Sequence, residues 1–124
     1  MSKCIMVVDD DAMNLKVADL ILKQQGYETV LASSGQDALN KLKMSRVDLI
    51  LLDIEMPEMD GLETFKYLML EYIEIPVMFL TASQDPEHEM EAAGLGAADY
   101  VKKPFMPQEL LSRVGKVFSE NAEE

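Results

Sequence analysis

The chain has 124 residues and a net charge of −12, with 48% apolar and 27% charged residues. This length and composition are typical of a globular domain with its own core, so we expect a single domain over residues 1–124. No apolar run approaches the roughly 18 residues of a membrane span. The acidic surface repels nucleic-acid phosphates and anionic lipid. A membrane span is therefore excluded, and direct binding of nucleic acid or membrane is not expected.

The N-terminal residues and the number of cysteines indicate the cellular compartment. Met1, Ser2 and Lys3 lead straight into an apolar run, without the pattern of a secretory signal. The single cysteine, Cys4, cannot form an internal disulfide, which is typical of a reducing compartment. We therefore expect a cytoplasmic protein.

Short apolar runs alternate along the chain with segments of helical periodicity. Continuous rather than alternating hydrophobicity, as in residues 49–52, indicates strands that are covered on both faces. In chain order the predicted elements are a strand at 4–8, a helix at 12–25, a strand at 29–32, a helix at 35–44, a strand at 48–52, a helix at 62–72, a strand at 76–80, a helix at 85–94, a strand at 98–101 and a helix from 107.

Residues with strong positional preferences support these helix ends. Asp11 is suited to the N-cap of the first helix, and Gly26 to the position just beyond its C-terminus. Ser34 and Asp37 have the spacing of a capping box at the second helix. Five successive β-then-α units predict the α/β class: a doubly wound, five-stranded parallel sheet in a flavodoxin-like (βα)5 sandwich.

Polar side chains end four of the five predicted strands. In the strand order 2-1-3-4-5, strands one and three lie side by side and are followed by strands four and five. The carboxyl ends of parallel strands share one edge of the sheet, so their terminal side chains converge there. These side chains are Asp9, Asp10 and Asp11 after strand one, Asp53 after strand three, Thr81 after strand four, and Lys102 and Lys103 after strand five.

This set of groups predicts phosphoryl chemistry. Two carboxylates ~4 Å apart repel each other by about 4 kcal/mol at an effective dielectric constant near 20. Three carboxylates call for a cation or for raised pKa values, and oxygen ligands with room for water suit Mg²⁺ or Mn²⁺. A cation and a lysine stabilise a transferring phosphoryl group, which a carboxylate can accept as the nucleophile. We therefore expect Asp53 to form an aspartyl phosphate.

The sequence resembles the receiver domains of bacterial two-component response regulators from Lys3 to about Val117. The resemblance depends on four motifs in the right order at the right strand ends. These motifs are Val7-Val8-Asp9-Asp10, Leu52-Asp53-Ile54-Glu55-Met56-Pro57-Glu58-Met59-Asp60-Gly61, Leu80-Thr81-Ala82 and Lys103-Pro104-Phe105.

The resemblance implies a phosphorelay role for the site. Asp53 would accept the phosphoryl group from a phosphohistidine of a sensor histidine kinase or a histidine phosphotransfer protein. Asp10 and Asp53 would bind Mg²⁺ directly, together with the backbone carbonyl of Glu55. Asp9 would act mainly through water, and Lys103 would pair with the phosphoryl group.

The resemblance also implies a switch and its regulation. The hydroxyl of Thr81 would move to the phosphoryl group while the ring of Tyr100 turns inward. Glu55 and Ser83 match positions that tune self-dephosphorylation, and the Lys103–Pro104 bond would be cis. The chain would be a signalling domain that catalyses its own phosphorylation and dephosphorylation rather than an enzyme acting on other substrates. It would signal to an output domain or protein and could form a phosphorylation-dependent homodimer.

Three alternatives remain from the residues alone. A haloacid-dehalogenase-like, Mg²⁺-dependent phosphatase also uses an aspartate nucleophile, but on the first strand and with a second aspartate two residues on, where this chain has Glu55. A flavodoxin-type binding module shares the strand order, but Asp9, Asp10 and Asp11 would repel its flavin phosphate. A receiver fold that only binds partners, without phosphorylation, is the third.

Overall fold

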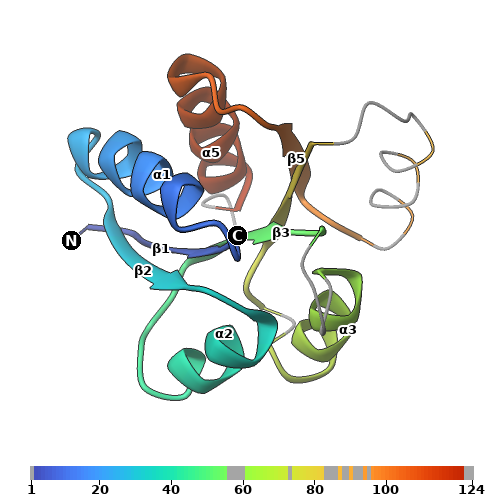
Figure 1. The fold of residues 1–124 in the computed structure, drawn as a ribbon. Coiled ribbons are helices and arrows are strands. Elements are labelled where there is room, and N and C mark those ends of the chain that lie inside the picture. Colours follow the sequence, from blue (N-terminus) through green and yellow to red (C-terminus); the bar gives the residue numbers. More distant parts are fainter. Residues whose placement is uncertain are drawn as a thin grey trace.

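The computed structural model describes residues 2–55, 61–72, 74–82, 87, 90, 94 and 96–121. A parallel sheet lies in the middle of the molecule, with helices on both of its faces (Figure 1). Helices α1 and α5 cover one face, and α2 and α3 cover the other. This arrangement confirms the predicted doubly wound α/β sandwich.

Every strand of the sheet runs parallel to its neighbours, in the order β2-β1-β3-β4-β5. The predicted order is therefore confirmed. The observed strands begin or end within one residue of the predicted ones. The strands are β1 (Cys4–Val8), β2 (Glu28–Ala32), β3 (Leu49–Asp53), β4 (Val77–Thr81) and β5 (Asp99–Lys102).

Helix α1 (Ala12–Gln24) has the predicted signals at both ends. The Asp11 side chain accepts a hydrogen bond from the Met13 amide at 2.8 Å, which satisfies one of the free N–H groups of the first turn. Gly26 follows the helix with a φ of 95°, in the left-handed region where glycine has no steric penalty.

Helix α2 (Gly35–Leu42) is shorter than predicted, because it ends at Leu42 rather than at residue 44. The Met44 amide donates to the Lys41 carbonyl, so the chain tightens into a turn. At the start of the helix, the Asp37 amide donates to Ser34 Oγ at 3.0 Å. The Asp37 carboxylate accepts from the Ser33 amide at 3.0 Å, one residue before the partner that a standard capping box uses.

The other described helices are α3 (Gly61–Glu71) and α5 (Pro107–Asn121). Pro107 occupies the first turn of α5, as predicted, where its missing N–H is not needed. The predicted helix over residues 85–94 lies mainly outside the described residues. Among the described residues, none of the helices is both long and apolar enough to cross a bilayer.

The sheet separates two apolar cores. β3 and β4 are buried along their whole length, which explains their uninterrupted apolar sequences. Phe65 of α3 and Phe79 of β4 pack edge to face, with ring centroids 5.0 Å apart, in the core under α2 and α3. The second core, under α1 and α5, includes Leu22, Leu51 and Val114. Both cores hold the strands, and therefore the strand ends, in a fixed arrangement.

Gly61 fixes how α3 approaches the strand that carries Asp53. Its amide donates to the Ile54 carbonyl at 3.3 Å. A β-carbon at this position would overlap the Asp53 carbonyl oxygen and the α-carbon of Ile54. The close approach therefore requires glycine, for reasons of space rather than of backbone conformation.

We predict that Gly61→Ala lowers the free energy of unfolding by about 1–3 kcal/mol, because α3 must move away from β3 to admit the methyl group. Gly115→Ala is the matched control. Gly115 lies inside α5 with nothing within 4 Å of the added carbon, so the change should stabilise the protein by about 0.5–1 kcal/mol. Urea denaturation midpoints measure the change in stability of both variants. Equal midpoints for Gly61→Ala and the wild type would contradict the close approach.

Candidate functional site

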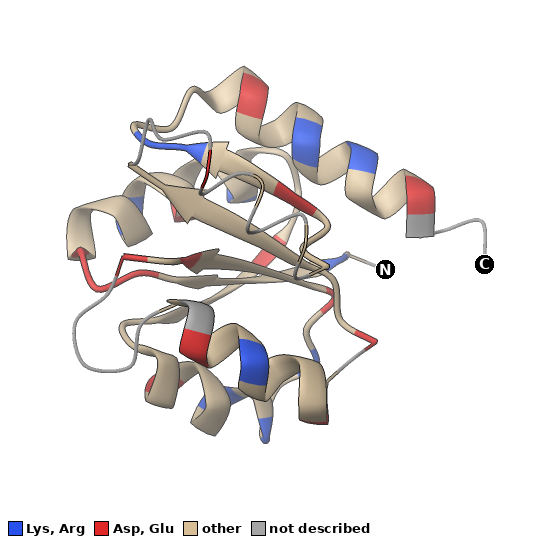
Figure 2. Ribbon diagram, turned by 90° about the vertical axis from the view of Figure 1, so that its right-hand side faces the viewer, with Lys and Arg blue, Asp and Glu red and all other residues tan. Residues whose placement is uncertain are grey.

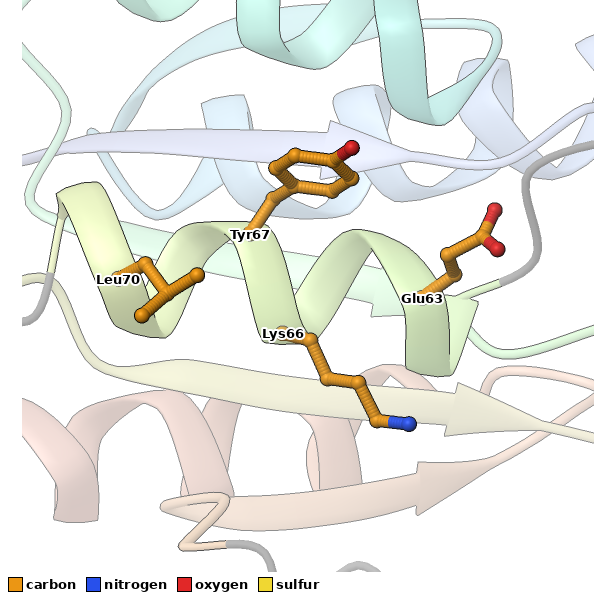
Figure 3. A pocket seen from close by; sticks show the side chains of 4 residues that line it. All are labelled: Glu63, Lys66, Tyr67 and Leu70. Carbon is orange, nitrogen blue, oxygen red and sulfur yellow. The ribbon is translucent and has the colours of Figure 1, made fainter.

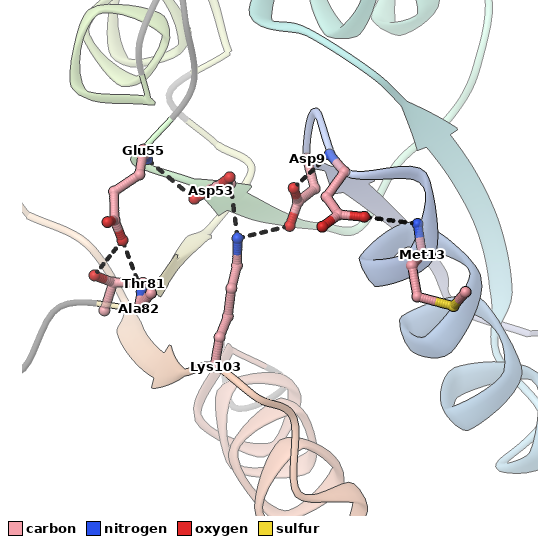
Figure 4. Close-up of polar contacts among 8 residues, drawn as sticks. Asp9, Met13, Asp53, Glu55, Thr81, Ala82 and Lys103 are labelled. Atoms are coloured by element: carbon pink, nitrogen blue, oxygen red, sulfur yellow. Dashed lines mark hydrogen bonds and ion pairs between the residues drawn. The ribbon is translucent and has the colours of Figure 1, made fainter.

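The polar strand ends lie together at one edge of the sheet (Figure 4). Val8 pairs with Leu52, so Asp9 and Asp53 are the next residues along two adjacent strands. Thr81 pairs with Lys102, which places Lys103 just beyond the end of β4. Figure 2 shows the consequence for charge: acidic segments (red) follow the central strands at the left, and a basic segment (blue) follows the strand above them.

An ion pair of three side chains forms the centre of the site. Lys103 Nζ lies 2.8 Å from Asp9 Oδ2 and 3.0 Å from Asp53 Oδ2. Asp9 is 0% exposed and Asp53 1% exposed. Two buried carboxylates so close together are unfavourable unless a cation lies between them, and Lys103 supplies that cation.

The other oxygen of each buried carboxylate is held by the backbone. Asp9 Oδ1 accepts from the Asp11 amide at 2.9 Å, and Asp53 Oδ1 accepts from the Glu55 amide at 3.0 Å. Both bonds reach two residues ahead, as in the turns that aspartate favours. Asp9 Oδ2 accepts no hydrogen bond from the described residues and has the Lys103 ammonium as its ion-pair partner.

The carboxylate cluster fits a hard divalent cation. Asp9, Asp10 and Asp53 each offer an oxygen, and these oxygens all lie within 4.8 Å of one another. Asp10 is exposed, so water has access to the cluster from its side. Carboxylate oxygens as ligands, with access for water, suit Mg²⁺ and Mn²⁺.

The cluster shifts the pKa of its members. Burial raises the pKa of Asp53 from 3.8 to about 6; the Glu55 amide and Lys103 oppose this rise, and the charge of Asp9 adds to it. Burial lowers the pKa of Lys103, but its contacts with Asp9 and Asp53 outweigh this effect, so the pKa is raised overall. Lys103 is therefore a permanent cation at neutral pH.

Glu55 and Thr81 meet at the end of β4. The Thr81 hydroxyl donates to Glu55 Oε1 at 2.9 Å, and the Ala82 amide donates to the same oxygen at 2.7 Å. The resemblance implied that the backbone carbonyl of Glu55 binds Mg²⁺ and that position 55 tunes self-dephosphorylation. It did not predict that the side chain would bind the threonine of the proposed switch.

Tyr100 of β5 is half-buried against the core under α2 and α3. The Arg113 guanidinium of α5 lies over its ring, 5.3 Å from the centroid. Arg113 also pairs with Asp99 at 2.6 Å and with Glu109 at 3.2 Å. The sequence did not single out Arg113, because one basic residue on a helix is usually a solvated side chain.

The remaining predictions at the site have mixed outcomes. The Lys103–Pro104 bond is cis, as the resemblance implied. Ser83 lies outside the described residues.

A separate hollow on the outer side of α3 is lined by Glu63, Lys66, Tyr67 and Leu70 (Figure 3). None of these four side chains belongs to the carboxylate cluster, so we do not include this hollow in the candidate site.

Comparison with known proteins identifies the family. The family model for the response regulator receiver domain matches residues 5–115, so the chain belongs to the response regulator receiver domains. The transcriptional regulatory protein CrdR of Helicobacter pylori is 38% identical over 122 residues, which are 98% of this chain and 57% of CrdR. The alkaline phosphatase synthesis transcriptional regulatory protein PhoP of Bacillus subtilis is 38% identical over 114 residues, which are 92% of this chain and 48% of PhoP.

Solved structures support the same assignment. The chemotaxis protein CheY4 of Vibrio cholerae superposes with a TM-score of 0.88 at 31% identity, covering 94% of this chain and 99% of that chain. A response regulator from Chloroflexus aurantiacus has a TM-score of 0.89 at 31% identity, covering 96% of this chain and 99% of that chain. This chain spans about half the length of the two transcriptional regulators, which contain further sequence.

The raised pKa of Asp53 predicts a pH dependence of stability in the absence of divalent ions. Between about pH 4 and 6, the folded protein retains a proton that the unfolded chain has lost. The stabilising effect of this proton is present near pH 4 and is lost as the pH rises through about 6. Asp53→Asn removes the charged form and leaves Lys103 paired with Asp9.

We therefore expect Asp53→Asn to be more stable than the wild type by about 1–3 kcal/mol at about pH 7.5 in EDTA, with the difference shrinking toward pH 4. Urea denaturation at a series of pH values measures this. Glu28→Gln, at the exposed start of β2, is the control and should show no such trend. A less stable Asp53→Asn at neutral pH would contradict the charge balance described here.

Proposed function

We propose that this receiver domain accepts a phosphoryl group on Asp53 in a Mg²⁺-dependent reaction. The donor is a phosphohistidine of a sensor histidine kinase or of a histidine phosphotransfer protein. The observation that carries the proposal is the Lys103 ammonium within 3.0 Å of Asp53 Oδ2, beside a cluster of three carboxylates. Membership of the receiver family supports the same chemistry.

The residues of the site have separate roles in the transfer. An Asp53 oxygen attacks phosphorus, the new P–O bond replaces the P–N bond, and the imidazole leaves and takes up a proton. Lys103 then turns from the Asp53 carboxylate to the phosphoryl oxygens and neutralises part of their charge. Asp9, Asp10, Asp53 and the carbonyl of Glu55 would hold Mg²⁺, which supplies charge stabilisation for the transferring group.

Thr81 and Tyr100 form the switch in this proposal. Thr81 lies at the end of β4, one strand from Asp53, and its hydroxyl can donate to a phosphoryl oxygen. Tyr100 lies on the next strand, between the apolar core and Arg113. Movement of the hydroxyl toward the phosphoryl group would open space for the ring and change the surface of β5 and α5.

The lifetime of the phosphoryl group depends on residues around Asp53. We propose that Glu55 and Ser83 tune self-dephosphorylation, because both match positions with this role in receiver domains and because Glu55 lies beside Asp53, where water would attack phosphorus. The domain would act on its own phosphoryl group and not turn over external substrates. It would work in the cytoplasm with an output domain or protein, which the additional length of the curated relatives supports.

Two alternatives have less support. The haloacid-dehalogenase-like phosphatase requires its nucleophile on the first strand, whereas Asp53 ends β3 and the family match is to receivers. A receiver fold that binds partners without phosphorylation does not need a buried carboxylate cluster. The chain has the complete set of residues for phosphorylation, which favours signalling by phosphorylation. These residues are Asp9, Asp10, Asp53, Thr81 and Lys103.

Intact mass after incubation with acetyl phosphate and Mg²⁺ tests the proposal. We expect the wild type to gain the mass of one phosphoryl group, and Asp53→Asn and the EDTA-treated wild type to gain none. Asp48→Asn, at the opposite end of β3, makes the same chemical change away from the site and should be phosphorylated like the wild type. No added mass on the wild type, or equal addition to Asp53→Asn, would contradict the proposal.

We further expect phosphorylation to promote a homodimer through β5 and α5, where Asp99, Glu109 and Arg113 form a charged network next to Tyr100. Gel filtration with and without beryllofluoride and Mg²⁺ measures the change. The expected result is earlier elution with beryllofluoride. Elution as a monomer in both states would exclude the dimer and leave the phosphoryl transfer itself unaffected.

A further inference from the structure

The Glu55 carboxylate accepts hydrogen bonds from two donors at the end of β4, as a bound anion would. Its Oε1 receives the Thr81 hydroxyl at 2.9 Å and the Ala82 amide at 2.7 Å. Two donors on one carboxylate oxygen form charge-assisted hydrogen bonds, which are stronger than those between neutral groups. In the view of Figure 4, the Glu55 side chain leads from the end of β3 to the end of β4.

The sheet explains why Glu55 reaches these donors. Asp53 pairs with Leu80 in the register of β3 and β4, and the Ile54 amide donates to the Leu80 carbonyl at 3.1 Å. Residue 55 therefore lies beyond the last bonded pair, opposite Thr81 and Ala82. The Glu55 amide at the same time donates to Asp53 Oδ1, so the backbone of residue 55 is held beside Asp53.

We propose that the Glu55 carboxylate occupies, in the unphosphorylated protein, the donors that receive the phosphoryl oxygens after transfer. This inference rests on the proposed function, because it assigns the oxyanion to Asp53. The Thr81 hydroxyl and the Ala82 amide each have one proton to donate. Neither can give that proton fully to Glu55 and to a phosphoryl oxygen at once, so the two anions compete.

The competition makes Glu55 a positioning residue for the switch. While its carboxylate is in place, the Thr81 hydroxyl donates to Glu55. Glu55 and Ala82 are exposed, so the displaced carboxylate can move into water. Release of Glu55 and binding of the oxyanion are then coupled steps, and the side chain sets how readily the site accepts an anion.

Beryllofluoride with Mg²⁺, a mimic of the phosphoryl group, provides the test. Glu55→Ala removes the competing carboxylate and keeps the backbone carbonyl. Glu55→Asp keeps the charge but is one methylene shorter and cannot reach Thr81 and Ala82 from the same backbone position. We expect both variants to bind beryllofluoride about three- to tenfold more tightly than the wild type, measured by ¹⁹F NMR titration.

Two further variants separate competition from simple charge repulsion. Glu55→Gln removes the charge but retains an oxygen that can accept from Thr81 and Ala82, so a smaller gain is expected. Glu28→Gln removes one charge at the far end of β2 and should bind like the wild type. If Glu55→Gln gains as much as Glu55→Ala while Glu55→Asp gains nothing, charge repulsion alone explains the result and the proposal is overturned.

The Ala82 amide gives a readout that does not require phosphorylation. In ¹H–¹⁵N spectra of the free protein, we expect Glu55→Ala and Glu55→Asp to shift this resonance upfield and speed its hydrogen exchange, and Glu55→Gln to change it less. An unchanged Ala82 amide in Glu55→Ala would overturn the contact. If even the wild type binds no beryllofluoride and gains no phosphoryl mass, the proposed function fails and this inference with it. If the wild type binds and the Glu55→Ala and Glu55→Asp affinities match it, only the inference fails.

Discussion

The site depends on one interaction, the contact of the Lys103 ammonium with the carboxylates of Asp9 and Asp53. These carboxylates are almost fully buried, and their Oδ2 atoms lie 2.8 and 3.0 Å from Lys103 Nζ. Without a cation between them, two such charges would repel each other or take up protons. The parallel sheet provides the geometry, because the ends of β1, β3 and β5 deliver all three side chains to one edge. The two apolar cores hold these ends in place.

The same balance of charges would let the site respond to a bound cation or to a phosphoryl group. Three carboxylates outnumber the single Lys103 ammonium, so the cluster has a net negative charge, and a divalent cation is its natural complement. A phosphoryl group on Asp53 would give Lys103 new partners and would draw on the donors at the end of β4. Glu55 connects Asp53 to Thr81, and Arg113 connects Tyr100 to α5. In the proposed switch, these contacts would carry a local change of charge at Asp53 toward the surface.

Much of this arrangement could be predicted from the sequence, because strands buried on both faces have continuous apolar runs. Their polar ends then identified Asp9, Asp53, Thr81 and Lys103 as neighbours. Other features depend on tertiary structure and have no local signature. Gly61 resembles a turn glycine until α3 is packed against β3, and Arg113 resembles a solvated residue until α5 lies over Tyr100. The direction of the Glu55 side chain depends on the register of β3 and β4, and the early end of α2 depends on a local turn at Lys41 and Met44.

Chemical trapping of the acyl phosphate tests the central claim most directly, because it identifies the modified residue. Borohydride reduces an aspartyl phosphate to homoserine, and peptide mass spectrometry then locates the change. After treatment with acetyl phosphate and Mg²⁺, we expect homoserine at position 53 and unmodified Asp9 and Asp10. Homoserine at either of those aspartates, or at no residue while the protein carries a phosphoryl group, would contradict the assignment of Asp53 as the phosphoacceptor.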